Sequence, residues 1–356
     1  MDLSIFNNNR NSNLELLRIL AMMGIVASHY IGCIIPQLHE LNTPLSNFLL
    51  IQGTWGKIGI NCFMLISGYF MCIQDASLKK WIKLLAWVYF YTVVIEIPLI
   101  IFGFIPNTFE SWWHAIFPWR FFDMDHFKTA FLIFYLFTPF VKKFIQTLTK
   151  KELERILILL TIIFVGYYNM PTFSDGMAKL INPLVWFSYL YLLAGYIRLY
   201  DNPFMHRNTA FWGGQLLLGV ILVCSSTLIL HYLGQNDHVY KYSGYTNSIF
   251  VFYTSLSSFI FFLKVDIPKS IIINVLGAST FGVLLIHTCC DTVYYFIFDD
   301  MLKTPVVLGL DFPKGVLVVC VSILSLYLVL SFIDILRRVF IEPILLKKIY
   351  SIFKIA

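Results

Sequence analysis

ELLRILAMMGIVASHYIGCII, residues 15–35, is a long apolar stretch that contains only a few ionisable side chains. At a rise of 1.5 Å per residue, a helix of this length reaches about 30 Å, the thickness of the hydrocarbon core of a bilayer. Comparable apolar stretches recur along the chain of 356 residues. The sequence therefore predicts several helices that cross a membrane.

The composition supports this fold class. Hydrophobic residues make up 58% of the chain and charged residues 13%, and the mean hydropathy is +0.76. Soluble domains carry about 25% charged residues, so a cytosolic enzyme, a disordered chain and a collagen-like fibre are all excluded. Long apolar runs, rather than short alternating segments, favour helices over a β-barrel. We expect an all-α integral membrane protein.

Ten segments are candidates for membrane spans, because each holds close to the roughly 20 apolar residues that a span needs. They lie near 15–35, 56–74, 84–104, 128–148, 154–169, 181–199, 210–232, 247–263, 270–290 and 315–336. No soluble domain fits between them. We expect one multi-pass domain over 1–356, with a short polar start at 1–13 and a basic tail at 337–356.

The basic residues predict the orientation of these spans. When the segments between spans are assigned to alternate sides, 19 of the 26 lysines and arginines lie on one side and 7 on the other. By the positive-inside rule, the richer side is cytoplasmic, and it holds both termini. The basic residues form short clusters between apolar runs and no basic domain, so nucleic acid is not an expected partner.

The first span carries three ionisable residues, Glu15, Arg18 and His29. Such residues are costly inside a bilayer and usually face a cavity or a partner. Arg18 and His29 are eleven residues apart, which places them about 20° from the same helix face and about 16 Å apart along the axis. Glu15 lies one turn before Arg18 and can pair with it. A purely structural role for Arg18 at the membrane surface and for His29 in helix packing is the alternative.

Other polar residues are weaker candidates, each with a packing or orientation role as its alternative. His287 is predicted near the outer end of the ninth span. Lys80 and Lys83 come just before the third span. The candidates are Asn61, Ser67, Tyr69, Lys80, Lys83 and His287. The seven cysteines lack metal-ligand spacing, and no GxSxG or HExxH motif is present, so we expect no metal site and no serine-hydrolase or zinc chemistry.

Three motifs together resemble the membrane-bound acyltransferase-3 family. They are NLELLR at residues 13–18 followed by His29, GINCFMLISGY at 59–69, and LLIH at 284–287. The resemblance implies a multi-pass bacterial enzyme that O-acylates surface polysaccharides and related glycans. Where the family commonly has an arginine motif before the third helix, this chain has Lys80 and Lys83, which lack the bidentate fork of arginine.

Together with the resemblance, these residues predict transfer of an acetyl or other short acyl group from acyl-CoA to a hydroxyl of a glycan or glycolipid, in the cytoplasmic (inner) membrane. His29 is the candidate general base or acyl-accepting nucleophile. Arg18, oriented by Glu15, is expected near the CoA, which is a substrate and not a permanently bound cofactor. Lys80, Lys83, Asn61, Ser67, Tyr69 and His287 are the candidate substrate contacts.

The expected partners are acyl-CoA, the acceptor, the lipid bilayer and polysaccharide-assembly proteins. One alternative is a transporter of glycan or lipid-linked intermediates that uses the same Arg18 and His29 without acyl chemistry. Another is a non-catalytic subunit of a polysaccharide-assembly complex.

Overall fold

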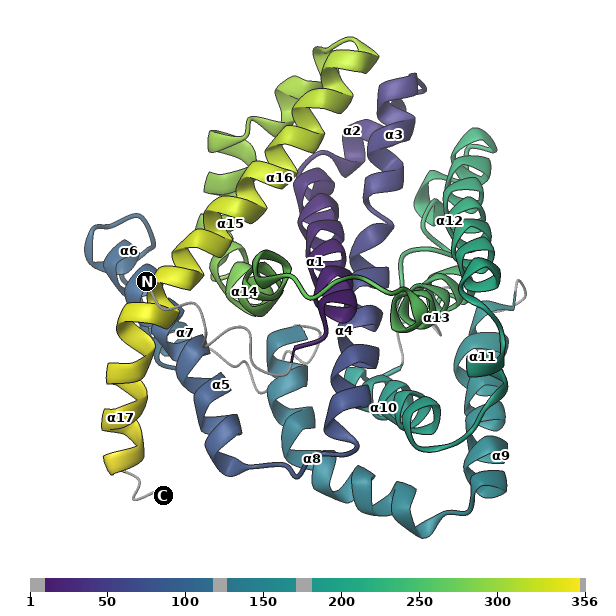
Figure 1. Cartoon of the computed structure of the whole chain (residues 1–356). Helices are drawn as coiled ribbons and strands as arrows, with labels where there is room; N and C mark the ends of the chain where they lie inside the picture. Colours follow the sequence, from purple (N-terminus) through teal and green to yellow (C-terminus); the bar gives the residue numbers. More distant parts are fainter. Residues whose placement is uncertain (1–9, 118–126, 171–180, 353–356) are drawn as a thin grey trace.

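The computed structural model describes residues 10–117, 127–170 and 181–352, and every regular element in these ranges is a helix (Figure 1). The longer helices are α1 (Ser12–Gly32), α3 (Pro44–Gln52), α4 (Trp55–Met71), α5 (Leu78–Tyr91), α7 (Phe109–Ile116), α8 (Phe127–Thr147), α9 (Lys150–Thr161), α10 (Pro183–Leu199), α12 (Thr209–Tyr232), α13 (Ile249–Lys264), α14 (Ile271–His287), α16 (Phe312–Leu336) and α17 (Glu342–Ile352).

Short helical segments connect or extend them. They are α2 (Ile35–Glu40), η2 (Thr92–Glu96), α6 (Ile97–Ile101), η3 (Ile162–Gly166), η4 (Tyr167–Asn169), α11 (Pro203–His206), η6 (Asn236–His238), α15 (Asp291–Tyr295), η7 (Phe296–Met301), η8 (Thr304–Gly309) and η9 (Arg337–Ile341). Residues 1–9, most of the predicted polar start, lie outside the described ranges. The segment predicted as a basic tail begins with η9 and α17, which continue α16.

The helices support a multi-pass membrane protein, although not the full count of ten. Within the described residues, five helical stretches are long and apolar enough to cross a membrane: Ser12–Gly32, Pro44–Met71, Leu78–Ile101, Thr209–Tyr232 and Phe312–Ile352. The pair Ile271–His287 and Asp291–Gly309, bent by 106°, is a sixth candidate. Each of the ten predicted segments overlaps a helix, but some, such as α10, α13 and α14, have only 16 or 17 residues. Ten spans and their orientation therefore stay predictions.

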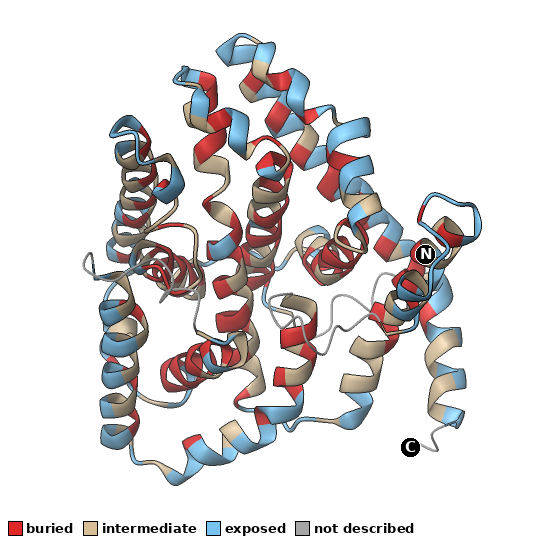
Figure 2. Cartoon of the chain, turned by 180° about the vertical axis from the view of Figure 1, so that it is seen from behind, coloured by how far each residue is buried: buried red, intermediate tan, exposed pale blue. Residues whose placement is uncertain are grey.

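Helix α1 lies near the centre of the molecule, with α14 on one side and α13 on the other, both seen almost end-on in Figure 1. Figure 2 shows that buried residues gather on these central helices and exposed residues on the outer ones. The close packing of α1 on α4 depends on glycine, because a Cβ at Gly59 would overlap the carbonyl oxygen of Ala21. Glycine at this position thus lets the two helices approach closely.

Helix α14 lies between α1 and α16 and is tied to both. The Ser12 hydroxyl at the start of α1 donates to the Asn274 amide oxygen over 3.0 Å, and both residues are buried. A Cβ at Gly277 would overlap the Glu15 carboxylate, and one at Gly282 would overlap the Asp334 carboxylate of α16. The two glycines thus make room for carboxylates of the neighbouring helices.

The chain bends sharply after His287, the last residue of α14. The bend brings α15 back against α1, where the Tyr294 hydroxyl donates to the His29 backbone carbonyl over 2.8 Å. This contact helps to position the end of α1 that carries His29.

Candidate active site

Two histidines from distant parts of the sequence meet between α1 and α14. Nδ1 of His29 lies 3.0 Å from Nε2 of His287, a hydrogen-bond distance. His287 is fully buried, whereas His29 is partly exposed. The Tyr294 ring lies edge-on to the His29 ring, with 6.0 Å between the ring centroids. The structure therefore brings together two of the residues that the sequence singled out.

The hydrogen bonds of His287 assign the protons of the pair. Nδ1 of His287 lies 2.6 Å from the backbone carbonyl oxygen of Val283, so Nδ1 must donate, since a carbonyl only accepts. In a neutral imidazole the other nitrogen then accepts, and Nε2 of His287 accepts from Nδ1–H of His29. This leaves Nε2 of His29 unprotonated, with its lone pair available for proton transfer.

His29 lines a cavity of about 460 Å³, here named the histidine cavity. This volume lies within the range of about 300–1,000 Å³ typical of sites for small molecules. Its wall combines apolar residues with polar and ionisable ones, among them His29, Lys57, Glu96, Lys128, Thr288 and Tyr294. The Lys128 ammonium donates to the Thr288 backbone carbonyl over 3.2 Å, which holds α8 against the end of α14.

A smaller cavity of about 200 Å³ is lined by Arg10, Arg18 and Arg338, and we name it the arginine cavity. Oε1 of Glu15 binds both Arg10, over 2.9 Å, and Arg18, over 2.8 Å. The Glu15 side chain is 4% exposed, against 29% for Arg10 and 22% for Arg18. A buried carboxylate thus holds two guanidinium groups at the cavity wall.

The two cavities adjoin, because Ile25, Phe127 and Leu284 line both of them. Arg18 and His29, predicted to share one face of the first helix, line the arginine cavity and the histidine cavity respectively. Their predicted separation of about 16 Å along α1 is consistent with their lining two neighbouring cavities. The three shared residues form a short apolar layer between the two cavities.

A family model described as an acyltransferase domain matches residues 11–333. The chain belongs to the acyltransferase-3 family. It is therefore a multi-pass membrane acyltransferase, and the resemblance inferred from its motifs is confirmed. Neither a curated protein nor a solved structure matches this chain.

Ser67 of the acyltransferase lines the arginine cavity, whereas Asn61 and Tyr69 from the same helix line neither of the two. Both ends of the buried Asn61 amide are used in packing: it donates to the Thr246 carbonyl over 2.7 Å and accepts from the Trp186 indole over 2.9 Å. The Tyr69 hydroxyl accepts from Arg198 over 2.6 Å. These contacts hold both side chains against neighbouring helices and loops, and their role as substrate contacts stays a prediction.

The two lysines predicted to bind substrate do not line either cavity. The Lys80 ammonium donates to the Gln74 side chain over 3.0 Å in an exposed position. Lys83 forms an ion pair of 2.5 Å with Glu342 of α17. The third cation of the arginine cavity is instead Arg338, from the far end of the sequence.

Several residues of the two cavities are not predicted from the sequence. Lys57 and Glu96 line the histidine cavity and fall inside predicted spans, so the cost of an ionisable group in a bilayer is a usable signal for both. Arg338 was counted only as an orientation charge. Tyr294 lies between predicted spans, and no local pattern distinguishes it from other aromatic residues of the chain.

Proposed function

We propose that this acyltransferase moves an acetyl or other short acyl group from acyl-CoA to a hydroxyl of a surface or exopolysaccharide, or of its lipid-linked precursor. The proposal places the protein in the cytoplasmic membrane, with the arginine cavity on the cytoplasmic side, as the charge asymmetry predicts. Polysaccharide-assembly proteins are the expected macromolecular partners. The supporting observation is His29, which is hydrogen-bonded to His287 and lines a cavity that adjoins one lined by three arginines.

The arginine cavity suits the donor. Acyl-CoA carries several phosphate groups, and guanidinium groups bind phosphate through charge-assisted, often bidentate, hydrogen bonds. From there, the narrow pantetheine arm would pass Ile25, Phe127 and Leu284 and bring the thioester to His29. The apolar character of this layer matches an arm with few charges.

The histidine cavity suits the transfer step. Nε2 of His29 takes the proton of the acceptor hydroxyl as its oxygen attacks the thioester carbonyl carbon. The tetrahedral intermediate then collapses, the carbon–sulfur bond breaks, and the CoA thiolate recovers the proton from His29. The hydrogen bond to His287 keeps the ring of His29 in the required tautomer and orientation.

A covalent route uses the same residues. In it, Nε2 of His29 attacks the thioester carbonyl carbon, the carbon–sulfur bond breaks and CoA leaves as the thiolate. The acceptor hydroxyl oxygen then takes the acyl group from the histidine, and the hydroxyl proton passes to the CoA thiolate. A single turnover with labelled acetyl-CoA and no acceptor separates the two routes, because only the covalent one leaves label on the protein.

Labelled acetyl-CoA supplied to membranes tests the proposed function. Membranes with the wild-type protein are expected to label glycan, and His29→Ala is expected to abolish the labelling at equal expression. His206→Ala is the matched control, since His206 is an exposed histidine paired with Asp201 and does not line either cavity. Unchanged labelling in His29→Ala would contradict the proposed role of His29. Glycan export that needs the protein without acetylation would indicate a transporter.

A further inference from the structure

Arg338 reaches the arginine cavity from the helical turn η9, which follows α16. Nε of Arg338 donates to Oδ2 of Asp334 over 2.7 Å, and Nη2 donates to the backbone carbonyl of Ala278 on α14. The guanidinium lies over the Trp87 ring, with its carbon 4.4 Å from the centroid. Trp87 and Ala278 also line the cavity, so three elements hold this side chain at the wall.

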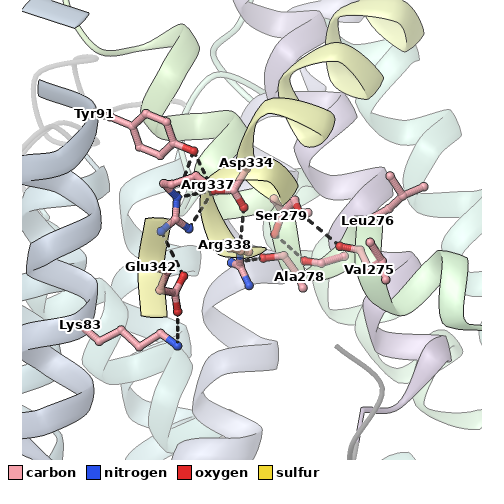
Figure 3. A network of polar contacts seen from close by, with 12 residues as sticks. Lys83, Tyr91, Val275, Leu276, Ala278, Ser279, Asp334, Arg337, Arg338 and Glu342 are labelled. Atoms are coloured by element: carbon pink, nitrogen blue, oxygen red, sulfur yellow. Dashed lines mark hydrogen bonds and ion pairs between the residues drawn. The ribbon is translucent and has the colours of Figure 1, made fainter. Parts of the chain in front are cut away.

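Asp334 is the centre of the network that holds Arg338 (Figure 3). It is fully buried, and its second oxygen, Oδ1, accepts from the Tyr91 hydroxyl over 2.8 Å and from Arg337 over 2.9 and 3.0 Å. Arg337 in turn donates to Glu342 over 3.0 Å, and Glu342 pairs with Lys83. The carboxylate therefore binds two arginines at once, and the wider network connects α5, α16 and α17.

The cations in and around this cavity outnumber the carboxylates. The cations are Lys83, Arg10, Arg18, Arg337 and Arg338, and the carboxylates paired with them are Glu15, Asp334 and Glu342. Five cations against three carboxylates leave an excess of two positive charges among these described residues. Burial lowers the pKa of Arg10, and the charges of Arg18 and Arg338 lower it further, while Glu15 opposes them. An anion in the cavity would relieve this repulsion.

We infer that Arg338, together with Arg10 and Arg18, binds the phosphate groups of the acyl donor, and that Asp334 is the positioning residue for Arg338. A volume of about 200 Å³ is below the range of about 300–1,000 Å³ for whole small-molecule sites, so the cavity fits the phosphate portion alone. The identity of the donor as a CoA thioester rests on the proposed function. Arg338 is thus a candidate phosphate contact in addition to the substrate contacts predicted at Lys80 and Lys83.

Binding of CoA to the purified full-length protein tests the inference without requiring acyl transfer. Isothermal titration in detergent is expected to show CoA binding about tenfold or more weaker in Arg338→Gln than in wild type, because a hydrogen bond to a charged group is lost. Arg207→Gln, an exposed arginine beside Phe211 and outside both cavity walls, is the matched control and should bind as wild type does. The probe 3′,5′-ADP, which lacks the pantetheine arm, should show the same dependence on Arg338.

A second variant protects the test against misfolding, since Arg338→Gln leaves one oxygen of Asp334 without its partner. Arg10→Gln removes a cavity cation that is 29% exposed, and it is also expected to weaken CoA binding. Wild-type CoA affinity in both folded variants would overturn the inference. Measurements in nanodiscs would also overturn the inference if Arg338→Gln weakened the binding of phosphatidylglycerol and left the binding of CoA unchanged.

The failure of the inference is distinguishable from that of the proposed function. Transfer of acetyl that requires His29, with an unchanged KM for acetyl-CoA in Arg338→Gln, would leave the function standing and overturn the inference. CoA binding that depends on Arg338, in a protein that transfers no acetyl group from acetyl-CoA, would uphold the phosphate site and overturn the function.

Discussion

The histidine cavity and the arginine cavity share a wall but hold their polar groups in opposite ways. At the histidine cavity, two imidazoles and a backbone carbonyl form a chain of hydrogen bonds that needs no charge. At the arginine cavity, partly or fully buried guanidinium groups are held by the carboxylates of Glu15 and Asp334. Burial of a charge is costly unless it is paired, whereas a neutral imidazole needs only hydrogen-bond partners.

This difference assigns different tasks to the two cavities. A neutral imidazole with an available lone pair is suited to proton transfer, and a cluster with excess positive charge is suited to holding an anion. Changes at the histidine cavity should therefore act on kcat, and changes at the arginine cavity on the KM for the donor. The variants below test this division.

The largest effect is expected from His29→Gln. Loss of a positioned general base lowers rates by about 10²–10⁴-fold, so kcat for acetyl transfer should fall by that factor. CoA affinity should stay at the wild-type value, because His29 does not line the arginine cavity. Initial rates in proteoliposomes together with CoA titrations check both statements. If His29→Gln kept its kcat and lost CoA affinity, His29 would serve donor binding and not proton transfer, which contradicts the division proposed here.

A smaller loss of kcat is expected from His287→Ala. This change removes the acceptor for Nδ1–H of His29, and an unpaired buried donor costs about 1–3 kcal/mol. The expected fall in kcat is about 10- to 100-fold. His287→Gln offers an amide oxygen as acceptor and should recover part of the rate. Equal rates in wild type, His287→Ala and His287→Gln would show that the pairing of the histidines is irrelevant to catalysis.

Gly282→Ala tests the arginine cavity from α14, the helix that also carries His287. Gly282 is close in sequence to His287, yet its added Cβ would overlap the Asp334 carboxylate, which holds Arg338. Overpacking of this kind costs about 1–3 kcal/mol, so we expect a lower thermal unfolding temperature and a raised KM for acetyl-CoA. Gly214→Ala on α12, which meets no atom within 4 Å, is the control and should retain wild-type stability. Equal unfolding temperatures for the two variants would contradict this packing.

The smallest effect is expected from Lys80→Ala, compared with Arg18→Ala. Lys80 makes an exposed contact with Gln74, which contributes little to binding or stability. The KM for acetyl-CoA should stay within about twofold of wild type in Lys80→Ala, and rise about tenfold in Arg18→Ala. A raised KM in Lys80→Ala would support the substrate contact that the sequence predicts for this lysine.

Much of the site could be predicted from the first helix alone. Glu15, Arg18 and His29 stood out because an ionisable group in a span is costly, and helix periodicity placed Arg18 and His29 on one face. Their pairing with partners such as Arg10 and His287 could not be predicted in the same way. His287 is 258 residues from His29 in sequence, and no local periodicity connects α1 with α14.

The sequence by itself determined that the chain is helical, apolar enough for a membrane and a member of its family, since composition, helix length and short motifs are local properties. Only the tertiary structure decided which polar groups from distant parts of the sequence meet. It placed Arg338 in the arginine cavity and left Lys80 outside, because the approach of helices depends on where glycines such as Gly59 and Gly282 make room. Those contacts depend on the packing of side chains far apart in the chain, which local patterns do not encode.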